Sequence, residues 1–134
     1  MRRLTAVLIV VLAAVAAMVP VAQAAEIDLF ARLHGSTAYP RARGHSEYER
    51  NGTAREVEVT AYAPRLHGRY VTVFVNGKRV GRMLVRSTGY AHREWSTHRG
   101  QYVPVAYAGS PVRVRTADGT LVVSGIYHRE ADDD

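Results

Sequence analysis

Three dipeptides in this chain, Asn51-Gly52, Asn76-Gly77 and Asp118-Gly119, each stand between two runs in which apolar and polar residues alternate. Alternation is typical of a strand with one buried face, and Asn-Gly or Asp-Gly between two such runs signals a two-residue hairpin turn. No stretch after residue 25 shows an extended helical period. The chain is therefore predicted to be all-β, an antiparallel β-sandwich or small barrel of about eight short strands.

The same alternation predicts which side chains face the core, because residues two apart on a strand share one face. One face of the stretch "EIDLFARLH" collects Ile27, Leu29, Ala31 and Leu33. The stretch "YVPVAYA" contains Pro104, which cannot donate to a ladder, so it is predicted to be an edge strand or an irregular connection. The later strands contribute the rest of the predicted core: Val57, Val59, Ala61, Val71, Val73, Val75, Val112, Val114, Leu121 and Val123.

The second hairpin contains a change of parity. The strand 71–75 presents its three valines on one face, and Val80 on the return strand fits that face, but Met83 has the opposite parity. A one-residue slip would turn side chains to the wrong face, so an extra residue is needed. We predict a β-bulge at Gly81.

The first hairpin concentrates carboxylates on one strand face. With Asn-Gly at its tip, Glu47 lies opposite Glu56 and His45 opposite Glu58, and Glu49 is beside them. Like charges directly across a sheet repel, so something should compensate them. A divalent cation, which prefers carboxylate oxygens, and arginines from a neighbouring strand both remain open. The candidate metal ligands are Glu47, Glu49, Glu56, Glu58 and His45, and no other cofactor is predicted.

Arginine dominates the basic residues. Lys78 is the only lysine among 18 basic residues, and the net charge is +6. Selection for bidentate contacts with phosphate, sulfate or carboxylate gives this pattern, and so does a GC-rich genome. The predicted partner is a protein or an acidic polymer at the cell envelope, with no specific nucleic acid. The candidate ligand-binding residues are Arg79, Arg82, Arg86, Trp95, Arg113 and Arg115.

The first residues predict export. The basic "MRR", the uncharged stretch Leu4 to Val19 and the small-x-small Ala22-Gln23-Ala24 are typical of a secretory signal peptide over residues 1–24. A membrane anchor is the alternative, but the apolar run is shorter than the roughly 20 residues a spanning helix needs. The predicted location is secreted or periplasmic, with one domain over residues 25–129 and an acidic, disordered tail over residues 130–134.

The sequence lacks the motifs of several catalytic and metal-binding classes. The chain has no cysteine, which excludes disulfides, thiol nucleophiles and Cys-zinc sites. "AGSPV" and "VVSGI" do not match the Gly-x-Ser-x-Gly elbow, and no phosphate loop or His-Glu-x-x-His spacing occurs. His92 and His98 lie about 20 Å apart along a strand at roughly 3.3 Å per residue, too far to share a metal unless the strand folds back near Ser96. The eight tyrosines and Trp95 form either a stacking platform or core packing.

The stretch Phe30 to Ala61 resembles the start of a chordin-type (CHRD) domain. It has an aromatic-led strand, a proline loop, a glycine-led strand, a turn and a valine-alternating strand in that order. The family's later His-x-His-Gly signature is missing, because "RLHGRY" retains only His67-Gly68. The resemblance implies a β-sandwich and an extracellular location, and no functional residues. The second half is more loosely similar to small secreted bacterial β-proteins.

Together these features predict an exported, non-catalytic binding or structural β-domain. Its ligand is a protein or an acidic polymer, engaged by the arginine-rich face and exposed aromatic side chains. The first alternative is a divalent-cation module built on the carboxylate hairpin. The second alternative is a small hydrolase, which would need a concave pocket with convergent polar groups.

Overall fold

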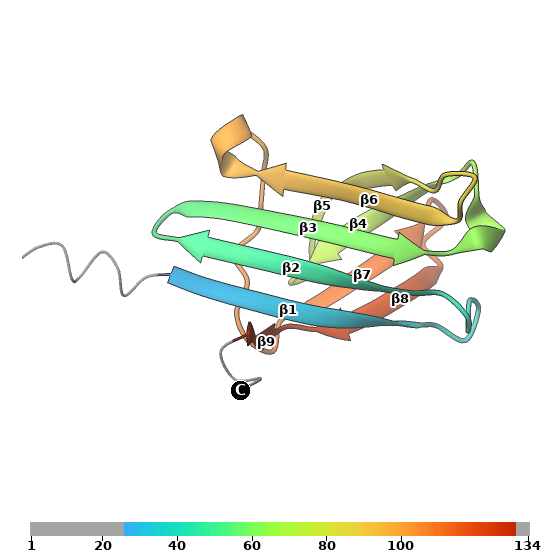
Figure 1. Ribbon diagram of the computed structural model, residues 1–134, viewed down its shortest axis with the longest axis horizontal. Helices are drawn as coiled ribbons and strands as arrows, with labels where there is room; N and C mark the ends of the chain where they lie inside the picture. Colours follow the sequence, from blue (N-terminus) through green and yellow to red (C-terminus); the bar gives the residue numbers. More distant parts are fainter. Residues whose placement is uncertain (1–25, 131–134) are drawn as a thin grey trace, which may run out of the picture.

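The computed structural model describes residues 26–130, which form strands joined by short turns (Figure 1). The predicted signal peptide and the end of the acidic tail lie outside the described residues. No helix in the described part is long and apolar enough to cross a membrane. The elements are β1 (Glu26–Gly35), β2 (Arg43–Asn51), β3 (Ala54–Tyr62), η1 (Pro64–Leu66), β4 (Tyr70–Val75), β5 (Lys78–Leu84), β6 (Tyr90–Ser96), η2 (Thr97–Arg99), β7 (Pro111–Thr116), β8 (Leu121–Ile126) and β9 (His128–Arg129).

The strands form one antiparallel sheet in the order β5-β4-β7-β8-β1-β2-β3-β6, and β9 pairs with β1. The sheet folds over so that β1, β2, β3 and β6 lie in front of β4, β5, β7 and β8 (Figure 1). Its two edge strands approach each other, where the Arg93 guanidinium on β6 donates to the Arg82 carbonyl on β5 at 3.0 Å. The sheet is therefore nearly closed into a barrel, which confirms the predicted fold class.

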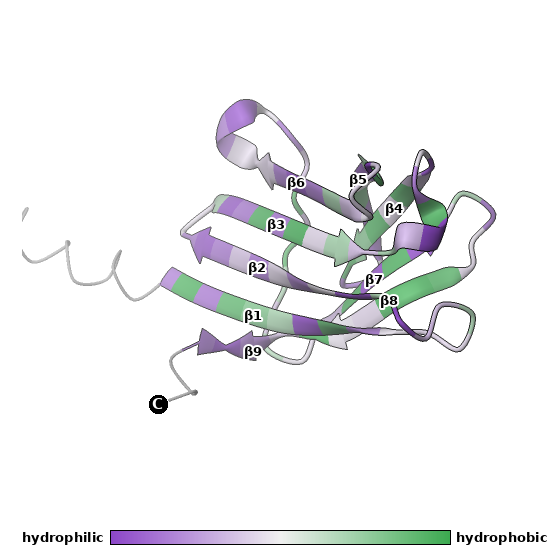
Figure 2. Ribbon diagram, turned by 45° about the vertical axis from the view of Figure 1, so that its right-hand side comes forward, coloured by the Kyte–Doolittle hydropathy of each residue, from purple (hydrophilic) through white to green (hydrophobic). Residues whose placement is uncertain are grey.

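Alternating side chains fill the space between the layers, and hydrophobic and hydrophilic residues alternate along the front strands (Figure 2). The predicted core residues are buried except Ile27 and Leu121, which are partly exposed. The pairing of β7 with β8 shifts between Val114 and Arg115, which leaves one extra residue on β8. Because of this bulge, the adjacent residues Val122 and Val123 are both buried. Alternation alone predicted Leu121 as the second buried residue, but Val122 takes that place.

The second hairpin has the predicted tight turn and bulge. Asn76 and Gly77 both have positive φ, 50° and 77°, as a type I′ turn requires. Phe74 pairs with Arg79 but Val73 pairs with Gly81, so Val80 is the extra residue. The bulge therefore lies at Val80-Gly81, and it turns Met83 into the core.

The first hairpin has a different tip from the predicted one. Asn51 pairs with Ala54, so the central turn residues are Gly52 and Thr53. Gly52 has a φ of 63°, and a glycine at the first central position is what a type II′ turn needs. The register is shifted by two residues, which changes the partners but keeps every side chain on its predicted face. The observed partners are Glu47 with Glu58, Glu49 with Glu56 and His45 with Thr60.

The stretch 101–110 is an irregular connection, one of the two predicted forms, and a buried tyrosine holds it against the core. The Tyr48 hydroxyl donates to the Pro104 carbonyl at 2.9 Å and accepts from the Ala106 amide at 3.1 Å. The Tyr127 hydroxyl lies 2.7 Å from the Ser46 hydroxyl beside it. Burial raises the pKa of both tyrosines, so the two hydroxyls stay protonated and keep their hydrogen bonds.

Candidate functional site

Four predicted ligand-binding arginines come together on the outer face of β5, β4 and β7. They form two rows across these strands: Arg79–Phe74–Arg113 and Arg82–Thr72–Arg115. Neighbouring strands are about 4.8 Å apart and successive rows about 6.6 Å apart, so the arginine Cα atoms lie at the corners of a rectangle of about 10 by 7 Å. We call these four arginines with Phe74 the arginine face.

The arginine face carries positive charge without an ion-pair partner. The sequences of β4, β5 and β7 contain no aspartate or glutamate. The ion pairs His92–Glu58 and Arg99–Glu94 do not involve these arginines. The Arg82 guanidinium lies 4.2 Å from the centroid of the Tyr70 ring, and Arg115 donates to the Gly119 carbonyl at 3.0 Å. Arginine cannot release its proton in proteins, so an external anion is what can offset this charge.

The other two predicted ligand-binding residues lie elsewhere. Trp95 is 3% exposed and packs under Gly81, where a Cβ would come within 2.7 Å of the indole nitrogen. It cannot present a ring face to a ligand, so this prediction is wrong: Trp95 belongs to the core. Arg86 follows β5 in an exposed loop, and its amide donates to the Tyr90 carbonyl at 2.9 Å.

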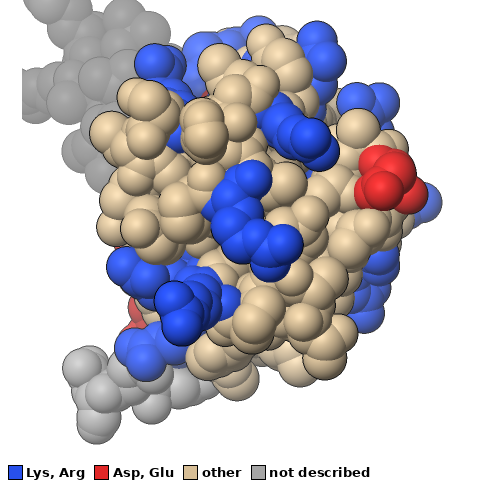
Figure 3. All heavy atoms as spheres, turned by 90° about the vertical axis from the view of Figure 1, so that its right-hand side faces the viewer, with Lys and Arg blue, Asp and Glu red and all other residues tan. Residues whose placement is uncertain are grey.

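The end of the molecule shown in Figure 3 is also basic. Lysine and arginine side chains are spread over this end, and the largest group of acidic atoms lies at one spot. Asp118 is the acidic residue of the β7–β8 turn at this end, where its carboxylate accepts from the Thr120 amide at 3.2 Å. Hydrogen bonds from Thr116 and Thr120 lower the pKa of Asp118. The Asp118 carboxylate is thus held by hydrogen bonds within the β7–β8 turn.

Almost all other described carboxylates gather on the outer face of β1, β2, β3 and β6, near the β2–β3 turn. Seven of them line an open hollow of about 280 Å³, and Glu26 lies beside it. We call this set the acidic face. Its members are Glu26, Asp28, Glu47, Glu49, Glu56, Glu58, Glu94 and Glu130.

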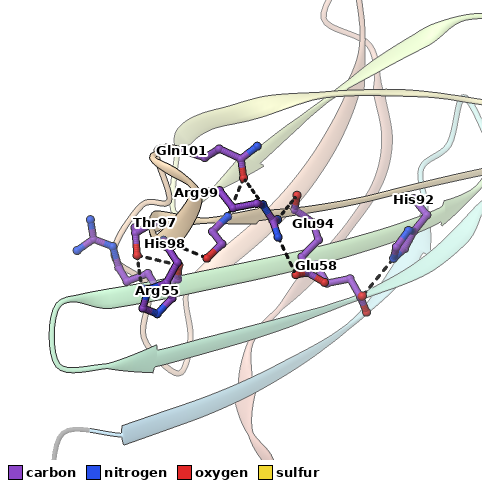
Figure 4. Close-up of polar contacts among 9 residues, drawn as sticks. Arg55, Glu58, His92, Glu94, Thr97, His98, Arg99 and Gln101 are labelled. Carbon is purple, nitrogen blue, oxygen red and sulfur yellow. Dashed lines mark hydrogen bonds and ion pairs between the residues drawn. The ribbon is translucent and has the colours of Figure 1, made fainter.

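Part of this negative charge is relieved within the protein. Arg99 lies 3.5 Å from Glu94 and His92 lies 3.2 Å from Glu58 (Figure 4). A hydrogen bond between the carboxyl groups of Glu56 and Glu94 raises the pKa of Glu56 and lowers that of Glu94. Desolvation and the nearby Asp28 carboxylate raise the pKa of Glu49. One arginine and one histidine therefore provide part of the compensation that the sequence left open, and the raised pKa values of Glu49 and Glu56 reflect the repulsion that remains.

The predicted metal ligands do not all meet at one point. Glu47, Glu49, Glu56 and Glu58 line the hollow, but His45 lies one row away, where its ring stacks on Phe30 at 6.1 Å. Within the described residues, one triplet brings three ligand oxygens within 4.8 Å of one another, and Glu49 is its only member from the predicted set. The other two members, Glu26 and Asp28, share the outward parity of β1, which was the signal available in the sequence.

The outer surface beside β1 contains basic residues that sequence reasoning missed. Arg113 pairs with Ser124, Ser124 with His34, and His34 with Arg43, so one row continues from the arginine face around β8 to β2. These pairings join segments far apart in the chain, and only the sheet order reveals them. The row runs Arg79–Phe74–Arg113–Ser124–His34–Arg43–Tyr62–Tyr90.

No protein-family model matches this chain, and no curated protein matches it either. The resemblance of residues 30–61 to chordin-type domains therefore stays a prediction.

Proposed function

We propose that this protein is a non-catalytic binding domain that engages an acidic polymer through the arginine face. The observation that carries the proposal is the pair of arginine rows on strands that contain no carboxylate. Guanidinium groups grip carboxylate, sulfate and phosphate with two parallel hydrogen bonds. Each of the four arginines in these rows can form such hydrogen bonds, and its backbone position is fixed by the sheet.

The shape of the arginine face favours a polymer over a small molecule. The four arginines lie on the outer surface of a sheet, and Arg79, Arg82 and Arg113 are exposed. An extended polyanion places successive charges along such a surface and releases its condensed counterions when it binds. The predicted export of the chain favours an acidic polymer of the cell envelope over an intracellular one.

Binding of heparin and polygalacturonate to the purified protein, measured by titration calorimetry with neutral dextran as a control, tests this proposal. We expect Arg79→Gln/Arg113→Gln to weaken polymer binding at least about tenfold, since a loss of about 1.4 kcal/mol corresponds to tenfold. The matched control is Arg41→Gln/Arg129→Gln, which removes the same charge from exposed positions outside the arginine face. Equal losses in both variants, or no polymer binding at all, would contradict the proposal.

A divalent-cation site on the acidic face is the second candidate. The convergence of carboxylate oxygens from Glu26, Asp28 and Glu49 favours it, because calcium is bound by several such oxygens. A cation that binds only the folded protein raises the melting temperature. Calcium should then raise the melting temperature of the wild type and not that of Asp28→Asn/Glu49→Gln. Identical curves with calcium and with chelator would rule this candidate out. The small-hydrolase alternative stays a prediction.

A further inference from the structure

Two hollows flank β1 on the outer surface, and they share Arg32 and His34. Their volumes are about 490 Å³ and 650 Å³, within the range of about 300–1,000 Å³ typical of small-ligand sites. No lining residue of either hollow is acidic, as far as the described chain goes. We call the two together the β1 cleft.

Arginine and tyrosine side chains are arranged together in the smaller hollow. The Arg43 guanidinium lies 4.3 Å from the centroid of the Tyr62 ring, and the Tyr62 and Tyr90 rings lie 4.7 Å apart. Stacking of this kind orients a guanidinium and leaves its N–H edges free for an anion. Tyr90 is 45% exposed, so an aromatic surface remains open beside the charge.

Two arginines can meet at one anionic group in this hollow. Arg32 on β1 pairs with His45 on β2, so Arg43 is its diagonal neighbour two residues along. Diagonal neighbours on one sheet face lie about 7–8 Å apart, within reach of long side chains. His34 and His45 complete the square of positions around the two arginines.

The larger hollow of the β1 cleft extends as far as the arginine face. Arg113 lines it and is also a corner of the arginine face. Ser124 links Arg113 to His34 in one row, and His128 lies beyond on β9. A ligand in the β1 cleft therefore lies next to the surface proposed to hold a polymer.

We propose that the β1 cleft binds individual acidic sugar units of a polysaccharide. Arg32 and Arg43 hold the carboxylate or sulfate group, and Tyr90 packs against the apolar face of the sugar ring. Thr60 and Ser124 line the two hollows and offer hydroxyl groups to the sugar. This inference rests on the proposed function, since the arginine face holds the rest of the polymer.

Short oligosaccharides separate the β1 cleft from the arginine face. The probes are tetragalacturonate, which carries carboxylates, a heparin tetrasaccharide, which carries sulfates, and neutral maltotetraose. We expect Arg32→Gln/Arg43→Gln to lower the affinity for the acidic tetrasaccharide that binds best at least tenfold. Arg79→Gln/Arg115→Gln should change it less than about threefold but weaken the binding of the long polymer.

Tyr90, which is 45% exposed, gives a second, independent test, and melting curves of its variants show whether the fold is kept. Tyr90→Ala should lower tetrasaccharide affinity about fivefold to tenfold, and Tyr90→Phe should leave it within about twofold, because the ring provides the contact. The comparison of tetragalacturonate with the heparin tetrasaccharide shows whether carboxylate or sulfate is the group recognised.

Three outcomes would overturn this inference. The first is that neither acidic tetrasaccharide binds. The second is that Arg32→Gln/Arg43→Gln and Tyr90→Ala both bind as the wild type does. The third is that maltotetraose binds as well as the acidic tetrasaccharides do. If the long polymer still depends on Arg79 and Arg113 in these cases, the proposed function stands and the β1 cleft alone is refuted. If the polymer itself fails to bind, both proposals fail.

Discussion

The acidic face and the smaller hollow of the β1 cleft lie on the same four strands, β1, β2, β3 and β6, but differ in how their charge is balanced. Going along β1 from the β2–β3 turn, acidic rows give way to basic ones within one step. The adjacent rows at this boundary are Phe30–Glu47–Glu58–Glu94 and Arg32–His45–Thr60–His92. Opposite charges thus lie side by side on one surface, yet within residues 26–130 His92 alone forms an ion pair across the boundary, with Glu58.

The difference lies in what each kind of group can do alone. Crowded carboxylates can bind protons as the pH falls, and the raised pKa values of Glu49 and Glu56 mean that their neutral forms are favoured more than in an isolated carboxyl group. Arginines cannot do this at any physiological pH. An anion from outside is therefore what can offset the charge of crowded arginines, whereas crowded carboxylates can also bind protons. The basic side is for this reason the better guide to a ligand.

The largest expected effect comes from a substitution in β2, the strand that the acidic face and the β1 cleft share. A Cβ on Gly44 of β2 would lie 2.2 Å from the Thr60 carbonyl oxygen, which is backbone and cannot move aside. Gly44→Ala should destabilise the fold by about 2–4 kcal/mol and lower the melting temperature by roughly 10–20 °C. Gly52→Ala is the control: its Cβ would meet nothing within 4 Å, and only its φ of 63° costs energy. A wild-type melting curve for Gly44→Ala would show that β2 can shift.

Next in size is the salt dependence of polymer binding, which sharpens the contrast between the two charges. Arg79→Gln/Arg113→Gln should reduce the slope of log affinity against log salt by about two, roughly one for each lost contact. Glu49→Gln/Glu56→Gln should leave that slope unchanged, because these residues lie on the acidic face. Calorimetry at four salt concentrations measures both slopes, and a change in the second would show that the polymer reaches the acidic face.

A smaller effect concerns stability against pH. The raised pKa values of Glu49 and Glu56 mean that their contribution to stability is present at low pH and is lost as pH rises through those values. Glu94, with its lowered pKa, acts in the opposite direction. Glu49→Gln/Glu56→Gln should therefore raise the melting temperature by about 2–5 °C at pH 7 and much less near pH 4. Equal shifts at both pH values would mean that charge repulsion is not the cause.

The smallest expected effect on stability is that of the His92–Glu58 ion pair, which crosses from the β1 cleft side to the acidic face. His92 and Glu58 are partly exposed, and exposed ion pairs contribute about 0–1 kcal/mol. A double-mutant cycle with His92→Gln and Glu58→Gln at pH 6 should give a coupling energy below about 0.5 kcal/mol. A larger coupling would mean that this contact joins the two surfaces more strongly than the geometry indicates.

Local patterns in the sequence predicted the fold class and the facing of side chains, because both depend on parity along each strand. The two-residue shift of the first hairpin left Glu47, Glu49, Glu56 and Glu58 on their predicted face. Parity failed at Leu121, where a bulge inserts one residue.

Pairings between distant segments were beyond local patterns. Asp28 joins the acidic face because β1 pairs with β2, and Glu94 joins it because β3 pairs with β6. Arg32 and Arg43 were not candidates because the hollow around them is formed by strands from both halves of the chain. Trp95 was misplaced because the packing of its ring against Gly81 requires β5 to lie beside β6.

The seam between β5 and β6 has a consequence for behaviour at high concentration. An exposed strand edge can add a strand from another molecule and so begin aggregation. Here the β5 edge carries Lys78, Arg79 and Arg82, is bent by the bulge at Val80, and has one carbonyl occupied by Arg93. Charge, curvature and a side-chain cap each discourage strand addition at this edge. A chain without disulfides can thus leave its barrel incompletely closed and still resist polymerising through the opening.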